Sequence, residues 1–212
     1  MRIETKRLLY AFFFPGLFIF ILGLMALLEK GFGADWHRWG IYPRAIEGLW
    51  GILTSPLIHS GVRHLFSNSV SLMILSWCLF YFYKETGFAV APVLWILSGV
   101  LTWCIGREAW HIGASGLIYA LSFFLFFSGI FRKYIPLMAV SLLVVFLYGS
   151  TLWNMFPIAE IIDPSISWEG HLSGAISGLI CAGIFRKYGP QKPVEPEDLE
   201  EEDMEDLEQH IQ

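Results

Sequence analysis

Ser115 and His171 are the two residues of this sequence best suited to act as a nucleophile and its base. Ser115 lies in the run Gly113-Ala114-Ser115-Gly116, whose glycines would let other backbone approach while the hydroxyl stays accessible. His171 lies at the start of the last apolar run. A histidine that takes the proton of a serine and returns it to a leaving amine performs acid–base catalysis of acyl transfer. The pair is therefore a candidate for the reacting groups of a hydrolase.

Both residues also have a structural interpretation. Small residues are common where membrane helices pack, and a GxSG motif alone favours packing over chemistry. His171 could be satisfied by a backbone carbonyl or by interfacial water, although an unpaired imidazole in apolar surroundings is costly. The sequence around it repeats glycine every four residues, at Gly170, Gly174 and Gly178. This stripe predicts that another helix comes close to the one that carries His171.

A second polar cluster has the pattern HxxxxHxxxN, formed by His59, His64 and Asn68. His64 and Asn68 are four residues apart and would share one helix face. Their N–H groups, together with the backbone N–H of Ser115, could stabilise the oxyanion of a tetrahedral intermediate. The histidines, with His111, could instead bind zinc. The spacing is not HExxH, however, and no acid or cysteine lies nearby, so we expect neither a metal nor a cofactor.

The sequence does not place an acid as the third member of a triad. Asp163 and Glu169 lie in the loop before His171, and either could orient its ring. A serine–histidine pair can also work with the imidazole held by packing, and we expect that arrangement. Tyr119, four residues after Ser115, lies on the same helix face and could stack on His171. It could equally be an ordinary core aromatic.

The composition predicts an all-α, polytopic membrane protein. The chain has 212 residues, of which 55% are hydrophobic and 16% charged, and its mean hydropathy is +0.56. A membrane helix needs about 20 mostly apolar residues. Six runs meet or approach this length, at residues 8–28, 65–83, 88–106, 112–131, 134–154 and 171–185. The first is too long for a signal peptide and has no small-residue cleavage site. The sixth could span only if it extends back through Trp168, or if its start lies below the membrane surface.

The loop charges predict the orientation of this six-helix bundle. With six crossings, both termini share one side. That side carries nine of the fourteen Lys and Arg residues, at positions 2, 6, 7, 84, 132, 133, 186, 187 and 192. The other side carries five. The excess predicts that both termini are cytoplasmic.

Two segments are not expected to span. Residues 29–63 form a long loop rich in aromatic residues, including Trp36, Trp39 and Trp50, which suggests residence at the interface. Ten of the nineteen acids lie between positions 195 and 208. We therefore divide the chain into a membrane domain, residues 1–188, and an acidic, disordered cytoplasmic tail, residues 189–212. The cysteines, at 78, 104 and 181, lie in apolar runs and are interpreted as buried small residues.

Three motifs together resemble those of the rhomboid intramembrane serine proteases. They are the GASG around Ser115, the HxxxxHxxxN from His59 to Asn68, and the run Glu169-Gly170-His171-Leu172-x-Gly174. They occur in that family's order, on the second, fourth and sixth expected helices. The resemblance covers roughly residues 10–188.

The resemblance implies roles for individual residues. Ser115 would be the nucleophile and His171 its base. His64, Asn68 and the Ser115 amide would stabilise the oxyanion, and Tyr119 would pack on the imidazole. It also implies that the 29–63 loop lies partly in the outer leaflet, and that the fifth helix and the loop after it act as a gate.

The sequence departs from the family in its first loop. The family often has Trp-Arg there, whereas Trp50 is followed by Gly51. The arginine is a structural residue of that loop, so the departure concerns the loop and not the catalytic pair.

Three functions follow as hypotheses. The first is an intramembrane serine endopeptidase with a Ser-His dyad, whose substrates are transmembrane proteins with locally unstable helices. The alternative is a catalytically inactive rhomboid-like protein that binds transmembrane helices. A small transporter or channel is disfavoured because no Asp or Glu lies in the expected spans and the hydropathy pattern has no internal repeat. We expect a bacterial inner membrane location, with the lipid bilayer and transmembrane substrates as partners and no nucleic acid.

Overall fold

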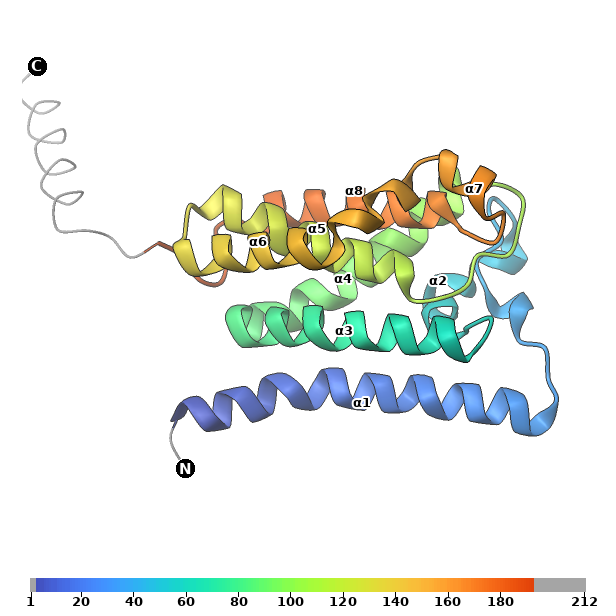
Figure 1. The fold of residues 1–212 in the computed structure, drawn as a ribbon, viewed down its shortest axis with the longest axis horizontal. Coiled ribbons are helices and arrows are strands. Elements are labelled where there is room, and N and C mark those ends of the chain that lie inside the picture. The colour runs from blue at the N-terminus through green and yellow to red at the C-terminus, as the bar shows by residue number, and fades with distance from the viewer. Residues whose placement is uncertain (1–2, 193–212) are drawn as a thin grey trace, which may run out of the picture.

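The computed structural model describes residues 3–192, and its fold is a bundle of helices (Figure 1). Residues 193–212, which hold most of the expected acidic tail, lie outside that range. The long helices are α1 (Ile3–Phe32), α3 (Val62–Tyr83), α4 (Glu85–Ile105), α5 (Ser115–Arg132), α6 (Ile135–Tyr148) and α8 (Trp168–Ile184). The short helices are α2 (Gly51–Thr54) and α7 (Ile158–Ile162), with 3-10 turns at His37–Trp39, Ile46–Gly48, Ser55–Leu57 and Gly149–Met155. Within the described range, the expected all-α class is confirmed.

Every expected span corresponds to a helix, but not every helix has the length to cross a bilayer. Four helices, α1, α3, α4 and α5, are long and apolar enough. α6 has 14 residues and continues as a 3-10 turn to Met155. α8 has 17 residues, or about 25 Å at 1.5 Å per residue. It begins at Trp168, because the Ser167 hydroxyl accepts a hydrogen bond from Gly170 N and caps the helix there. The six crossings and their direction stay predictions.

α5 lies at the centre of the bundle and α1 at its edge. α5 is the most buried of the four long apolar helices, and α1 the least. In Figure 1, α1 runs alongside α3, and the guanidinium of Arg7 donates to the Tyr81 carbonyl near the end of α3. Both ends of the described chain lie at one end of the bundle. α2, α7 and the loops before α5 and α8 lie at the opposite end. That second end holds the candidate site.

α5 and α8 pack with their backbones almost in contact. A Cβ atom added to Gly174 would collide with the Gly116 carbonyl, and one added to Gly178 would collide with the Ala120 carbonyl. The glycine stripe therefore does what its spacing predicts, which is to remove the side chains that would hold the two helices apart.

The first loop is fixed to α4 by hydrogen bonds from long side chains. The indole N–H groups of Trp95 and Trp103 donate to the carbonyls of Ile52 and Ala45, at 2.9 Å each. The guanidinium of Arg44 donates to the Gly106 carbonyl at 2.6 Å. An arginine thus holds this loop from a position six residues before Trp50.

Gly51, which stands where the family often has arginine, lies against the backbone of Gly40. A Cβ at Gly51 would collide with the Gly40 carbonyl. The close approach leaves no room for a side chain, so the departure from the family pattern fits the local packing.

One interpretation of the cysteines is wrong. Cys78 and Cys181 are buried as expected, but Cys104 is exposed in the last turn of α4. Its apolar sequence neighbours indicate a membrane helix without indicating which face of that helix turns inward.

We predict that Gly174→Ala destabilises the protein by about 1–3 kcal/mol, because the new methyl group overpacks the contact between α5 and α8. Gly183→Ala is the matched control on the same helix, since nothing lies within 4 Å of a Cβ added there. That change should be neutral or stabilise by about 0.5–1 kcal/mol. Denaturant unfolding in detergent, followed by circular dichroism, measures both. Equal stabilities of the two variants would contradict the packing argument.

Candidate active site

Ser115 is positioned by a sharp change of direction in the chain before α5. Gly113 has a φ of +101°, which a residue with a Cβ rarely adopts. Its N–H donates to the Ser55 carbonyl at 2.9 Å, which ties this turn to the first loop. Ser115 then begins α5 as its first residue and is half-buried. Its N–H belongs to the first helical turn, where N–H groups have no partner within the helix.

The structure places the imidazole of His171 against the hydroxyl of Ser115. The Nε2 and Oγ atoms are 2.9 Å apart, a hydrogen-bond distance, and His171 is buried. The other ring nitrogen, Nδ1, lies 2.8 Å from the carbonyl oxygen of Asn154. A carbonyl only accepts hydrogen bonds, so Nδ1 carries the proton and Nε2 keeps its lone pair. The neutral ring is therefore oriented to accept the Ser115 proton.

Tyr119 lies on the other side of this imidazole. The two rings are stacked, with centroids 4.4 Å apart and planes inclined by 15°. A carbonyl holds one edge of the His171 ring and a phenol ring covers one face. This is the arrangement by packing that the sequence favoured over a third acidic residue.

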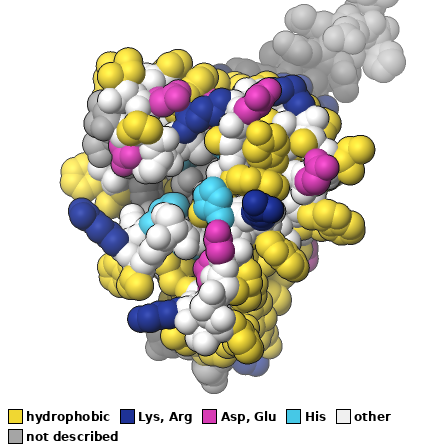
Figure 2. Space-filling view, turned by 90° about the vertical axis from the view of Figure 1, so that its right-hand side faces the viewer, with side chains coloured by type: hydrophobic (Ala, Val, Ile, Leu, Met, Phe, Trp, Pro, Cys, Tyr) yellow, Lys and Arg dark blue, Asp and Glu magenta, His cyan; other side chains and the backbone are white. Residues whose placement is uncertain are grey.

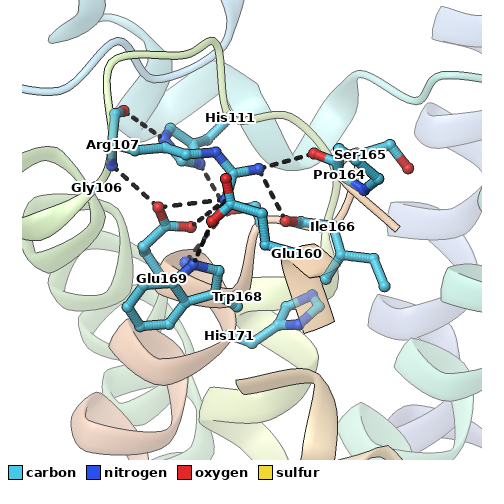
Figure 3. Close-up of polar contacts among 12 residues, drawn as sticks. Gly106, Arg107, His111, Glu160, Pro164, Ser165, Ile166, Trp168, Glu169 and His171 are labelled. Atoms are coloured by element: carbon cyan, nitrogen blue, oxygen red, sulfur yellow. Dashed lines mark hydrogen bonds and ion pairs between the residues drawn. The ribbon is translucent and has the colours of Figure 1, made fainter. Parts of the chain in front are cut away.

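The two acids weighed as partners of His171 contact other groups. Asp163 accepts from the N–H and hydroxyl of Ser165. These bonds lower the pKa of the exposed Asp163 carboxyl. Glu169 accepts from the backbone N–H and the guanidinium of Arg107 (Figure 3).

Polar residues of α3 and of the turn just before it form two separate hydrogen-bonded pairs. The amide nitrogen of Asn68 lies 3.0 Å from His59 Nε2 and, as an amide nitrogen only donates, His59 must be neutral to accept this bond. Ser60 Oγ lies 3.2 Å from His64 Nδ1. A Cβ at Gly113 would lie 3.2 Å from His64 Nε2, so this ring reaches the turn before Ser115. The structure therefore brings both expected oxyanion donors to the side of the cleft facing α5.

Burial holds His59 in its neutral form. Burial, and to a smaller extent the charge of nearby His64, lower the pKa of His59 from 6.5 to about 4. His59 thus supports Asn68 over the neutral pH range, with no charge of its own.

An open cleft of about 1050 Å³ reaches these residues. Its lining includes both dyad side chains, both α3 donors, Tyr119 and Asn154. Figure 2 views the end of the molecule with the loops, which is hollowed near its middle, with histidine side chains at the hollow. Water and an extended segment of peptide can both enter a space of this size.

The site includes residues whose roles the sequence reasoning missed. Arg107 contacts Glu169, and His111 Nδ1 lies 2.6 Å from the Ser167 hydroxyl. A serine followed by an acid in the first turn is a helix-start signal that could have found Ser167.

His111 was weighed only as a metal ligand. Among the described residues, no group of three or more His, Cys, Asp or Glu side chains lies in a metal-binding arrangement.

Comparisons with known proteins cover the whole candidate site. A family model described as the rhomboid domain matches residues 47–188. An uncharacterized protein of Mycobacterium tuberculosis is 33% identical over 174 residues, which are 79% of this chain and 72% of that protein. Rhomboid-related protein 2 of Mus musculus is 27% identical over 189 residues, 78% of this chain and 62% of that protein. Putative rhomboid protease YdcA of Bacillus subtilis is 25% identical over 178 residues, 77% and 85% respectively.

We predict that the protein loses stability as the pH falls from 6.5 to about 4, because His59 takes up a proton more readily in the unfolded state than in the folded state. In this window the unfolded state binds the proton and the folded state does not, so stability rises with pH and is lost on acidification. One such group changes the free energy of unfolding by at most about 1.4 kcal/mol per pH unit. His59→Gln keeps an acceptor for Asn68 but does not titrate. Its unfolding free energy should therefore fall less over this window than that of the parent, and identical pH dependences would contradict the prediction.

Proposed function

Because the chain belongs to the rhomboid family, we propose that it is an intramembrane serine endopeptidase that cleaves transmembrane segments of membrane proteins. Ser115 is the nucleophile and His171 is the general base. One observation carries the proposal. The Nε2···Oγ distance is 2.9 Å, and the carbonyl on Nδ1 leaves Nε2 as the acceptor.

The proposed reaction has two steps. Ser115 Oγ attacks the carbonyl carbon of the peptide bond while its proton passes to His171 Nε2. The C–N bond then breaks as Nε2 gives that proton to the leaving nitrogen, and an acyl ester remains on Ser115. Water attacks the ester with the help of the same base, which releases the carboxylic acid and restores the serine hydroxyl.

The oxyanion of each tetrahedral intermediate needs donors that are already in place. The Ser115 N–H, at the positive end of α5, is one. The Asn68 amide is a second, since its nitrogen has two N–H bonds and His59 uses one. His64 is a third, when Ser60 donates to Nδ1 and the proton of the ring lies on Nε2. These three groups belong to α3 and α5, and the His64 and Asn68 side chains both lie close to Gly113, two residues before Ser115.

The membrane setting is part of the proposal. Six crossings and cytoplasmic termini agree with the distribution of Lys and Arg along the chain. A bacterial inner membrane agrees with the bacterial relatives. In this orientation the cleft opens at the external end of the bundle, where water is available. A substrate helix must unwind there before a peptide bond can reach Ser115, which favours segments with glycine or proline.

The alternative, a rhomboid-like protein that only binds transmembrane helices, would not need an aligned dyad. Such a protein has no use for a serine hydroxyl within hydrogen-bond distance of a neutral imidazole of fixed tautomer. The geometry therefore favours the peptidase, and variants of the two dyad residues decide between the two functions.

We predict that Ser115→Ala and His171→Ala each abolish cleavage of a model transmembrane substrate by the purified protein in detergent. Labelling by a fluorophosphonate probe should also disappear in Ser115→Ala. Ser122→Ala is the control, because Ser122 is buried on the same helix but does not line the cleft. It should cleave at the rate of the parent. Parental cleavage by both dyad variants, with normal helicity, would refute the peptidase and leave the binding function.

We predict that Asn68→Ala lowers kcat by about 10²–10³-fold, the usual effect of removing one oxyanion donor. KM should change little, because the donor acts on charge that develops during the reaction. Ser71→Ala is the matched control, since Ser71 also lines the cleft from α3. Steady-state kinetics on one substrate measure both variants. An Asn68→Ala enzyme with the kcat of the parent would contradict the role of Asn68 as an oxyanion donor.

A further inference from the structure

Three polar contacts join the segment from Arg107 to Ser115 to the segment from Ser167 to His171. The first contact is that of Ser115 with His171. Four residues earlier on each segment, His111 meets Ser167 at 2.6 Å. Towards the end of the bundle, Arg107 meets Glu169 at 3.1 Å. The dyad is thus one of three links between the same two segments.

Arg107 and Glu169 form a largely buried ion pair. The Glu169 side chain is only 3% exposed, against 27% for Arg107. The carboxylate accepts from the Arg107 backbone N–H at 3.1 Å and from the guanidinium at 3.1 and 3.4 Å. A buried carboxylate without its partner is costly, so this contact strongly constrains the position of both residues.

The same guanidinium also holds the backbone of the loop before α8 (Figure 3). Its second terminal nitrogen donates to the carbonyls of Pro164 and Ile166, at 2.9 and 3.0 Å. Arg107 also pairs with Glu160, at 3.3 Å, but that carboxylate is 45% exposed. We call Arg107, Glu169 and the carbonyls of Pro164 and Ile166 the Arg107 clamp.

The middle contact connects the clamp to the start of α8. His111 Nε2 lies 3.0 Å from the Arg107 carbonyl, and Nδ1 meets the Ser167 hydroxyl. That hydroxyl in turn accepts from Gly170 N and caps α8. The Ser167 carbonyl accepts from His171 N at 3.1 Å. The Ser167 end of the first turn of α8 is thereby tied, through His111, to the segment that leads to Ser115.

We propose, on the basis of the proposed peptidase function, that the Arg107 clamp positions the dyad. Glu169 is a positioning residue: it lies two residues before His171 and does not contact the imidazole, which has its own partners. It acts by fixing the first turn of α8 relative to the chain before α5. In a serine–histidine–aspartate triad the acid contacts the imidazole and fixes its position. Here the clamp fixes the position of His171 indirectly, by holding the helical turn that carries it.

A small shift of this turn is enough to disable the dyad. A displacement of α8 by one residue along its axis is 1.5 Å, which breaks a 2.9 Å hydrogen bond. A misplacement of about 1 Å by a distant substitution can cost about 100-fold in rate. The expected effect of losing the clamp is therefore a fall in the rate at Ser115, with substrate binding retained.

The test is Glu169→Gln in the full-length protein in detergent. Glutamine keeps the size of the side chain but loses the charge. We expect kcat and the rate of fluorophosphonate labelling of Ser115 to fall about tenfold to a hundredfold, with KM little changed. Glu160→Gln is the matched control, because it removes the other carboxylate of the same guanidinium at an exposed site. Its kcat should be that of the parent.

Two further variants separate positioning from general stability. Arg107→Met should give a loss similar to that of Glu169→Gln, and the double variant should lose little more, because both act through one contact. All rates are measured well below each unfolding midpoint. If Glu169→Gln does not fold, Arg107→Lys replaces it. Lysine keeps the charge but lacks the planar fork that holds the carboxylate and two carbonyls together, so kcat should again fall.

The outcomes distinguish this inference from the function on which it rests. A parent protein that labels at Ser115, with a folded Glu169→Gln or Arg107→Lys variant that labels and cleaves at the same rate, overturns the clamp alone. A parent protein that neither labels nor cleaves overturns the peptidase, and the clamp as a device for positioning it.

Discussion

The close contact between α5 and α8 is the constraint on which the rest of the site depends. Gly174 faces the Gly116 carbonyl and Gly178 faces that of Ala120, so the residue numbers in contact rise together along both helices. The two helices are therefore parallel, and one register fixes every pair along them. Ser115 and His171 are 56 residues apart in the sequence, and the two residues of each glycine contact are 58 apart, so all three contacts share nearly the same register. The packing that brings the backbones together thus also sets the position of the imidazole against the hydroxyl.

This dependence explains why the polar chemistry lies at one end of the bundle. The middle of the contact is filled by small residues and cannot hold an open site. The first turns of α5 and α8 flank loops and a cleft of about 1050 Å³, where polar groups can be hydrated or paired. Polar groups in the apolar interior would cost several kcal/mol each if left unpaired. Loop residues then complete the site: the Asn154 carbonyl orients the imidazole and the turn at Gly113 presents the serine.

Much of this arrangement was predictable from the sequence, because it follows from local spacing. The apolar runs indicated the helices, the glycine stripe indicated the close contact, and the separation of Ser115 from Tyr119 indicated a shared face. Two contacts between distant segments, of Ser115 and of Tyr119 with His171, were expected from the motifs, but the contacts that support them were not predictable. Nothing near Glu169 in the sequence indicates that Arg107, 62 residues earlier, lies beside it. Nor could hydropathy show that Cys104 faces outward, since runs that are apolar on all sides do not reveal which face is buried.

The electrostatics of the site follow from the same parallel arrangement. Both N-termini, each with a partial positive charge, lie at the site. In the proposed reaction this charge stabilises the oxyanion but opposes an imidazolium on His171. The Asn154 carbonyl offsets the second effect, because its dipole points its negative end at the Nδ1 proton. Glu169, in the first turn of α8, adds a negative charge near the same ring, and its pairing with Arg107 offsets that charge. In the proposed mechanism the dyad therefore needs no third acid. The backbone carbonyl of Asn154 stabilises the charged ring, and the buried pair of Arg107 and Glu169 holds the helix that carries it.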